Sequence, residues 1–171
     1  VENKPGAGGI VALKKVIQAP ANGYNLYACT KSNIAKFVQV GGNDYVDALS
    51  WVAMLMADPE CIITNRQMPI HQWADVLENA RQNPGEQNWV GPAAGGLDHV
   101  TALKIWDKYG IEAKWIPFKS GGKALAALLG EQGIAYVGNP RDALGNPDLF
   151  IAAVSSPQRL EAFPDVPTFT E

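Results

Sequence analysis

The sequence contains few of the residues that carry most enzyme chemistry or that cross-link small folds. There are two cysteines and two histidines among 171 residues, and the cysteines form neither a CxxC pair nor a metal-binding pattern. No basic cluster extends beyond Lys14 and Lys15, and the net charge is -3, which argues against nucleic acid as the main partner. No apolar run approaches the ~20 residues that a membrane-spanning helix requires.

The two cysteines, Cys29 and Cys61, admit two interpretations. They are two buried thiols, or they form a single disulfide if the compartment is oxidising. Their separation in the sequence does not show whether the sulfur atoms lie close together in space. Both interpretations therefore stay open at this point.

Hydrophobic residues make up 47% and charged residues 18% of the chain, a composition that supports a packed core. Helix-type and strand-type patterns alternate along it. Strands that are almost entirely apolar and that alternate with helices predict an α/β fold with largely parallel sheets. The predicted helices cover residues 8–19, 32–38, 71–82, 100–109 and 122–129, and the predicted strands cover residues 24–30, 50–57, 61–64, 88–91, 113–118, 134–137 and 149–155.

A glycine cluster, PGAGG at residues 5–9, stands before the first predicted helix, where a phosphate-binding loop would stand. A dinucleotide fingerprint requires a third glycine where Val11 stands, and a carboxylate about 20 residues further on, which is lacking. Gly122 and Lys123 are followed by Ala124 rather than by the Ser or Thr of a P-loop. The cluster therefore indicates a close approach of backbone at a helix start, without a nucleotide cofactor.

Hydrolytic chemistry has no complete residue set in this sequence. A GxSxG motif is absent. His71 stands at the start of a predicted helix, where a solvated polar residue is ordinary. His99 closes the loop GPAAGGLDH at the entry to another helix, where it either caps and packs or takes part in a site. Asp98 and His99 are the best candidates for a general acid/base pair.

Several stretches resemble, in order, the substrate-binding proteins of the tripartite tricarboxylate transporters, the Bug or TctC-type family. VENKPGAGGIVA and APANGYNL are similar to the family texts VENRPGAGG and AAPDGYTL. WVAMLMADPECIITN, NPGEQNWVG, IPFKSGGKALAALLGEQ and FPDVPTFTE resemble further family stretches. The resemblance covers nearly the whole chain, and PGAGG corresponds in it to a structural turn.

The resemblance implies a type II periplasmic binding-protein fold, with two α/β lobes and a ligand cleft between them. Residues 1–58 and 145–171 are expected in the first lobe, and residues 59–144 in the second. Family members have a strand and a helix before the VEN segment and further helices after FTE, so the first lobe is expected to be incomplete here. Because an incomplete sheet exposes unpaired strand edges, we expect copies of the chain to associate through that lobe.

The resemblance also implies a function and a compartment. The expected function is that of a periplasmic receptor, not an enzyme, that captures a small organic anion or zwitterion for integral membrane transporter subunits. No cofactor and no metal are implied. An enzyme or a sensor module on the same binding-protein fold is the alternative.

Three loops are expected to face the cleft, because each follows a strand end, where ligands of open α/β sheets gather. Helix N-termini at these loops offer N–H donors to a carboxylate. Ser32 and Ser120 are also ordinary N-cap residues. Asp98 departs from the Ser-Pro-Ser text of the family, and it favours a zwitterion or an amide over a plain dicarboxylate. The expected ligand-binding residues are Thr30, Lys31, Ser32, Ala94, Gly95, Gly96, Asp98, His99, Lys119, Ser120, Gly121 and Gly122.

Overall fold

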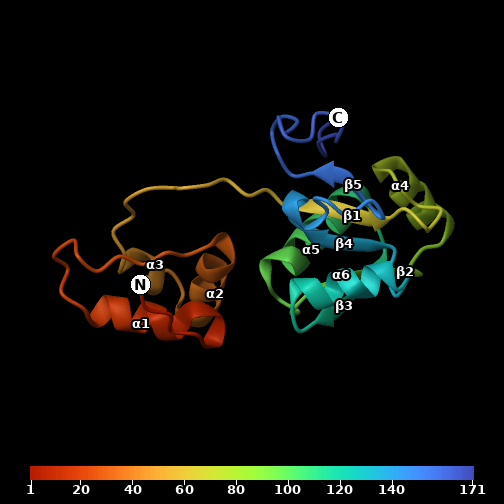
Figure 1. Cartoon of the computed structure of the whole chain (residues 1–171). Coiled ribbons are helices and arrows are strands. Elements are labelled where there is room, and N and C mark those ends of the chain that lie inside the picture. Colours follow the sequence, from red (N-terminus) through yellow and green to blue (C-terminus); the bar gives the residue numbers. More distant parts are fainter. The chain divides into compact units, whose positions relative to one another are not determined.

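The computed structural model describes residues 1–171, except for the environment of Gly8. The chain divides into two compact units, Val1–Leu55 and Met56–Glu171 (Figure 1). Among the described residues, every helix is too short or too polar to cross a bilayer.

The first unit is helical and has a small core. A 3-10 turn, Ala7–Gly9, leads into α1 (Ile10–Gln18), which is followed by α2 (Lys31–Gly41) and α3 (Asp44–Asp47). α1 ends at Gln18, because Ala19 precedes a proline and takes an extended conformation. Ile10, Leu13 and Phe37 are buried together and form the core of this unit.

The turn at the PGAGG cluster is structural, as the sequence predicts. Gly9 has a positive φ of 97°, and its carbonyl oxygen accepts a hydrogen bond from the Tyr27 hydroxyl at 3.3 Å. A Cβ atom at this position would lie 2.8 Å from Nδ2 of Asn33 and 2.9 Å from the Tyr27 hydroxyl. A glycine is therefore needed for the start of α1 to approach α2 and Tyr27.

Two strand predictions in this part of the chain are wrong for the described structure. Residues 24–30 and 50–57 form no strand, and Tyr24 and Leu55 are 91% and 93% exposed. A strand needs a neighbouring segment for its N–H and C=O groups. Neither segment has such a neighbour in the described sheet, so an apolar, aromatic-rich sequence alone does not produce a strand here.

The second unit contains a five-stranded sheet and three α-helices. The strands are β1 (Cys61–Asn65), β2 (Gln87–Pro92), β3 (Ala113–Phe118), β4 (Ala135–Gly138) and β5 (Leu149–Val154). The helices are α4 (Trp73–Gln82), α5 (Leu97–Tyr109) and α6 (Gly121–Leu129), and a 3-10 turn covers Pro140–Asp142. Each of these strands and α-helices lies within a few residues of its predicted position, whereas the 3-10 turn at Pro140–Asp142 is not among the predicted elements.

The sheet is mixed rather than largely parallel. The strand order is β3-β2-β4-β1-β5. β2 is parallel to β3 and β4, whereas β1 runs antiparallel to both β4 and β5. An apolar pattern indicates that both faces of a strand are buried, and a reversed central strand satisfies this equally well. The pattern therefore does not determine the direction of β1.

Helices cover both faces of this sheet, because successive strand side chains point to opposite faces. Ile62 and Trp89 pack on one face with buried residues of α4 and α5. Ile63 and Val90 pack on the other face with α6 and with residues of the C-terminal segment. The second unit is thus a three-layer α/β arrangement (Figure 1).

The C-terminal segment belongs to the second unit in this structure. β5 pairs with β1, the N–H of Val154 donates to the carbonyl of Pro167 at 3.0 Å, and the Tyr109 hydroxyl donates to the carbonyl of Phe169. The sequence-based division instead joined residues 145–171 to residues 1–58. That division stays a prediction about the lobes of the whole protein.

Candidate functional site

Three parallel strands, β2, β3 and β4, end at one edge of the sheet of the second unit, and a helix or 3-10 turn follows each of them. The first loop is bonded to the end of β3, since the N–H of Ala93 donates to the carbonyl of Phe118 at 3.0 Å. Loops at the carboxyl ends of parallel strands are where open α/β sheets bind ligands. The structure therefore brings together two of the three predicted loops.

The loop after β2 is held in shape by His99. Its Nδ1 accepts a hydrogen bond from the N–H of Gly95 at 3.0 Å, and its ring stacks on Trp115 with centroids 4.9 Å apart and planes 28° apart. Trp115 in turn requires Gly91, because a Cβ atom there would lie 2.2 Å from the indole ring. His99 thus positions Gly95 and Gly96 at the start of α5.

The loop after β3 leads into α6. Ser120 is the N-cap, and its hydroxyl accepts a hydrogen bond from the N–H of Lys123 at 3.3 Å. Gly121 and Gly122 form the first turn, where helix N–H groups have no partner within the helix. A Cβ atom at Gly121 would lie 3.0 Å from the Tyr136 hydroxyl, so the small residue lets Tyr136 approach. The predicted N-cap role of Ser120 is confirmed.

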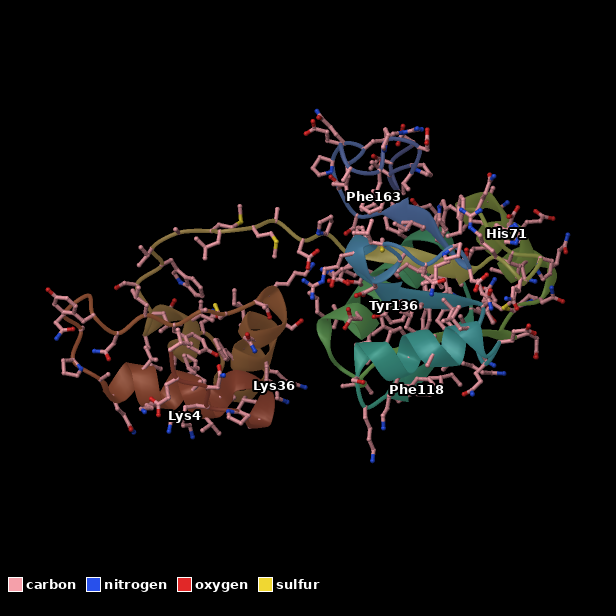
Figure 2. The ribbon with its side chains drawn as sticks, viewed as in Figure 1. Lys4, Lys36, His71, Phe118, Tyr136 and Phe163 are labelled. Carbon is pink, nitrogen blue, oxygen red and sulfur yellow. The ribbon has the colours of Figure 1, made fainter. Side chains whose placement is uncertain are left out.

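A group that the sequence analysis missed lies after β4. The Tyr136 hydroxyl donates to Oδ2 of Asp142 at 3.1 Å, and the N–H of Asn139 donates to the same oxygen at 3.0 Å. Nδ2 of Asn139 donates to the carbonyl of Pro59 at 3.2 Å. Figure 2 shows Tyr136 within the second unit. This network connects the end of β4 with the segment that enters β1.

The sequence did contain a signal for this third loop. Asn139 precedes Pro140 directly after a predicted strand, and an Asn N-cap followed by proline is a typical helix start. The contact between Tyr136 and Asp142 depends on tertiary packing, however, and no local pattern contains it.

Two carboxylates, Asp98 after β2 and Asp142 after β4, affect the pKa of the Tyr136 hydroxyl. Burial raises the pKa of Tyr136, and the negative charge of Asp142, its hydrogen bond and the charge of Asp98 raise it further. The phenol therefore remains a neutral donor. The edge of the sheet thus combines the N–H groups of two helix N-termini with two carboxylates, which is a set that suits both a carboxylate and an amino group.

The remaining predicted loop belongs to the first unit. The N-cap of α2 is Thr30, so the N-cap prediction for Ser32 is wrong, and the N–H of Thr30 donates to Oδ1 of Asn33 at 2.9 Å. Lys31 and Ser32 lie in the exposed first turn of α2. These three residues belong to the first unit, whereas the loops after β2 and β3 belong to the second.

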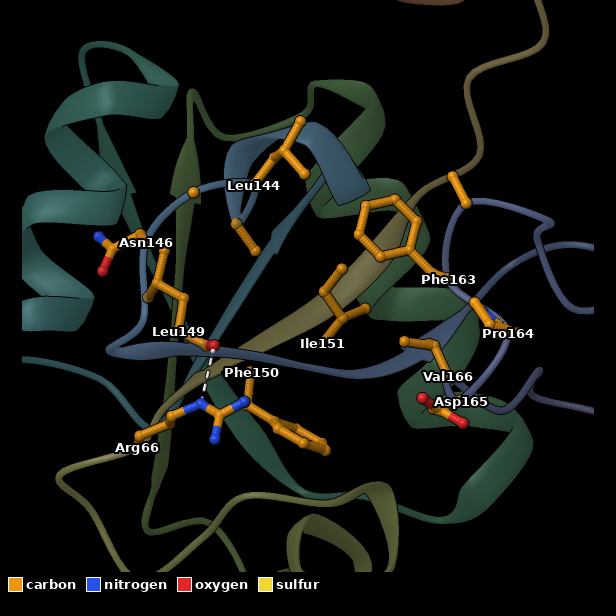
Figure 3. A pocket seen from close by; sticks show the side chains of 13 residues that line it. Arg66, Leu144, Asn146, Leu149, Phe150, Ile151, Phe163, Pro164, Asp165 and Val166 are labelled. Atoms are coloured by element: carbon orange, nitrogen blue, oxygen red, sulfur yellow. Dashed lines mark hydrogen bonds between the residues drawn. The ribbon is translucent and has the colours of Figure 1, made fainter.

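A surface hollow of about 450 Å³ lies elsewhere in the second unit (Figure 3). Leu149, Ile151 and Phe163 are among its lining residues. Nε of Arg66 donates to the carbonyl of Leu149 at 3.2 Å, and the guanidinium lies 5.2 Å from the centre of the Phe150 ring. The lining is mainly apolar, with Asn146 and Asp165 as further polar residues, and none of the candidate loop residues belongs to it.

Neither Cys29 nor Cys61 forms a disulfide in the described structure, so the disulfide interpretation does not hold there. Cys61 is buried in β1, and Cys29 is half-buried in the first unit, where burial raises the pKa of its thiol. Within the described part of the chain, no group of three or more His, Cys, Asp and Glu side chains is placed to hold a metal ion.

Known proteins resemble this chain along its whole length. A UPF0065 protein from Bordetella pertussis is 26% identical over 176 residues, which cover 100% of this chain and 54% of that protein. A TctC solute-binding protein from Polaromonas, solved without ligand, is 23% identical with a TM-score of 0.76, covering 99% of this chain and 59% of the other. MatC from Rhodopseudomonas palustris, solved with bound malate, is 21% identical with a TM-score of 0.74, covering 98% and 59%.

The chain spans about half the length of the curated relatives it matches. The two solved structures share its fold, so the chain has the α/β fold of a periplasmic binding protein, as the resemblance implied. A family match described as "Tripartite tricarboxylate transporter family receptor" extends over residues 1–171. The chain therefore belongs to the tripartite tricarboxylate transporter receptor family.

Proposed function

We propose that the chain is the part of a periplasmic receptor that captures a small organic acid or an amino acid for a tripartite transporter. The observation that carries this proposal is the convergence of the starts of α5 and α6 at one edge of the sheet, where Ala93 bonds to Phe118 and Tyr136 approaches Gly121. Two helix N-termini supply N–H donors and favourable dipoles to an anion. The malate in MatC supports a carboxylate ligand.

The acidic residues at this edge favour a ligand that also carries an amino or amide group. Asp98 lies in the first turn of α5, and Asp142 follows β4. A carboxylate at an anion site repels a second carboxylate and attracts an ammonium group. An acidic amino acid, which has both charges, therefore satisfies the two helix N-termini and the two aspartates better than a plain dicarboxylate does.

We also propose Thr30, Lys31 and Ser32, at the start of α2 in the first unit, as ligand-binding residues of the receptor. The start of α2, like the starts of α5 and α6, offers N–H groups that have no partner within the helix. We infer that the receptor passes its ligand to integral membrane subunits of the transporter, since the family is named for that assembly. Residues 145–171 are still assigned, in this proposal, to the first lobe of the whole protein, together with residues 1–58.

The experiment is isothermal calorimetry of the whole protein against malate, succinate, aspartate, glutamate and their amides. We expect at least one of these compounds to bind well below the millimolar range, with an acidic amino acid or an amide bound more tightly than the matching dicarboxylate. A protein that binds none of them at millimolar concentration would contradict the receptor function. A protein that prefers succinate to aspartate would contradict only the assigned ligand class.

A further inference from the structure

A second hollow, of about 470 Å³, lies in the second unit between one face of α5 and the chain around the end of β5. Thr101, Lys104, Ile105 and Lys108 line it from α5. Their spacing of three and four residues places them on one face of the helix. Across the hollow, the lining continues through residues 154–157 and 169–170.

This hollow has a positive and hydroxyl-rich lining. Lys104 and Lys108 contribute two ammonium groups, and Thr101, Ser155, Ser156 and Thr170 contribute hydroxyls, whereas none of the lining residues is acidic. Two lysines four residues apart on a helix repel each other. Among the described residues neither lysine forms an ion pair, although Nζ of Lys108 lies 5.5 Å from the centre of the Tyr109 ring. An anion would relieve the repulsion.

The floor of the hollow is apolar and firmly packed. Tyr109 and Phe169 line it, and the Tyr109 hydroxyl donates to the carbonyl of Phe169. The Trp73 ring meets Tyr109 and Phe169 edge-on, with centroids 5.2 Å and 5.1 Å apart. A wall that is already ordered loses little conformational entropy when a ligand binds.

We propose that this hollow is a second anion-binding site, which takes a carboxylate or phosphate group carried on a compact apolar body such as an aromatic ring. Its volume falls within the usual range for small-molecule sites, about 300–1,000 Å³. Its chemistry differs from that of the hollow in Figure 3, where the single lining cation, Arg66, is engaged by Leu149 and Phe150. The site is separate from the proposed receptor function, because no candidate loop residue lines it.

The test is NMR titration of the whole protein with phenyl phosphate and with benzoate, and with benzyl alcohol as the uncharged control. We expect both anions to shift the Lys104 and Lys108 side-chain signals, and benzyl alcohol to bind much more weakly. The double variant Lys104→Met/Lys108→Met should weaken phenyl phosphate binding by roughly ten-fold, since each partly solvated ion pair is worth less than a factor of ten. Lys114→Met, which removes an exposed lysine on β3, should leave binding unchanged.

Three results would overturn the proposal. The first is the absence of phenyl phosphate binding at millimolar concentration in a protein whose lysines remain open to amine-labelling reagents. The second is equal weakening by Lys114→Met, which would show a general charge effect. The third is protection of Lys104 and Lys108 from labelling without any added ligand, which would show that another part of the protein fills the hollow.

Discussion

Residues 1–55 and residues 56–171 both contain apolar segments of strand length, but those segments have different surroundings. Ile62 and Ile63 on β1 are fully buried, and β1 pairs with β4 on one side and β5 on the other. Val52 and Met54 belong to an equally apolar segment and are 82% and 84% exposed. Apart from the short α3, which the sequence does not predict, the α-helices of both units form near their predicted positions, because a helix makes its backbone hydrogen bonds internally. A strand depends on a partner that the local sequence does not supply.

The cores of the two units differ in the same way. Three residues, Ile10, Leu13 and Phe37, form the buried cluster of the first unit, whereas both faces of the sheet in the second unit carry a cluster. Because small cores bury little apolar surface, we expect the first unit to be much less stable than the second. The predictions below test this difference and its consequences for the site.

The largest effect is expected for Trp89→Ala. Trp89 is fully buried, contacts Trp106 edge-on at 5.6 Å, and its Nε1 donates to Oε1 of Gln87 at 2.9 Å. Truncation should lower the free energy of unfolding of the second unit by about 3–5 kcal/mol. Phe37→Ala should instead abolish protection in the first unit alone. Amide hydrogen exchange resolves the two units, and equal loss of protection in both units by either variant would contradict the expected difference in stability between them.

A smaller loss is expected for Gly91→Ala, which adds a Cβ atom 2.2 Å from the Trp115 ring. Overpacking of this kind costs about 1–3 kcal/mol. Gly122→Ala is the matched control, because a Cβ atom there meets nothing within 4 Å. Thermal unfolding should show a lower transition for Gly91→Ala only. An unchanged unfolding transition in Gly91→Ala would show that Trp115 and His99 move freely and do not hold the loop after β2.

Tyr136→Phe should cost about 1–2 kcal/mol near neutral pH, because Asp142 loses a hydrogen-bond donor. The pKa of Tyr136 is raised above its ordinary value of 10.0 in the folded protein. The stabilisation is therefore complete below about pH 10 and declines as the pH rises further. Urea unfolding from pH 7 to 11 should show the difference between wild type and variant narrowing above that pH. A constant difference would contradict the burial of a neutral phenol.

The smallest effect concerns ligand choice. Asp98→Ser should strengthen binding of a plain dicarboxylate and weaken binding of a zwitterion by about 1 kcal/mol, as expected for a partly solvated charge pair. Asp107→Ser is the matched control, since Asp107 is exposed near the other end of α5. Calorimetry with both ligands measures the ranking. An unchanged ranking in the Asp98 variant would show that Asp98 points away from the ligand.

The sequence predicts local features well and long-range ones poorly. The stripe of Val76 and Ala80 on α4 and the N-cap at Ser120 follow from patterns a few residues long. The direction of β1 and the contact between Tyr136 and Asp142 depend on which segments meet in the fold. Two of the three candidate loops can be located for the same reason, because strand ends are readable from sequence, whereas the partner of a buried hydroxyl is not.

The most direct measurement is amide NMR of the whole protein with the tightest ligand from the calorimetric panel. We expect the largest shifts at the N–H groups of residues 95–99, 120–122 and 139–142, which lie at the starts of α5, α6 and the 3-10 turn after β4. Shifts that spare these three loops and cluster around Arg66 and Phe163 would contradict it, because the ligand would then occupy the hollow in Figure 3.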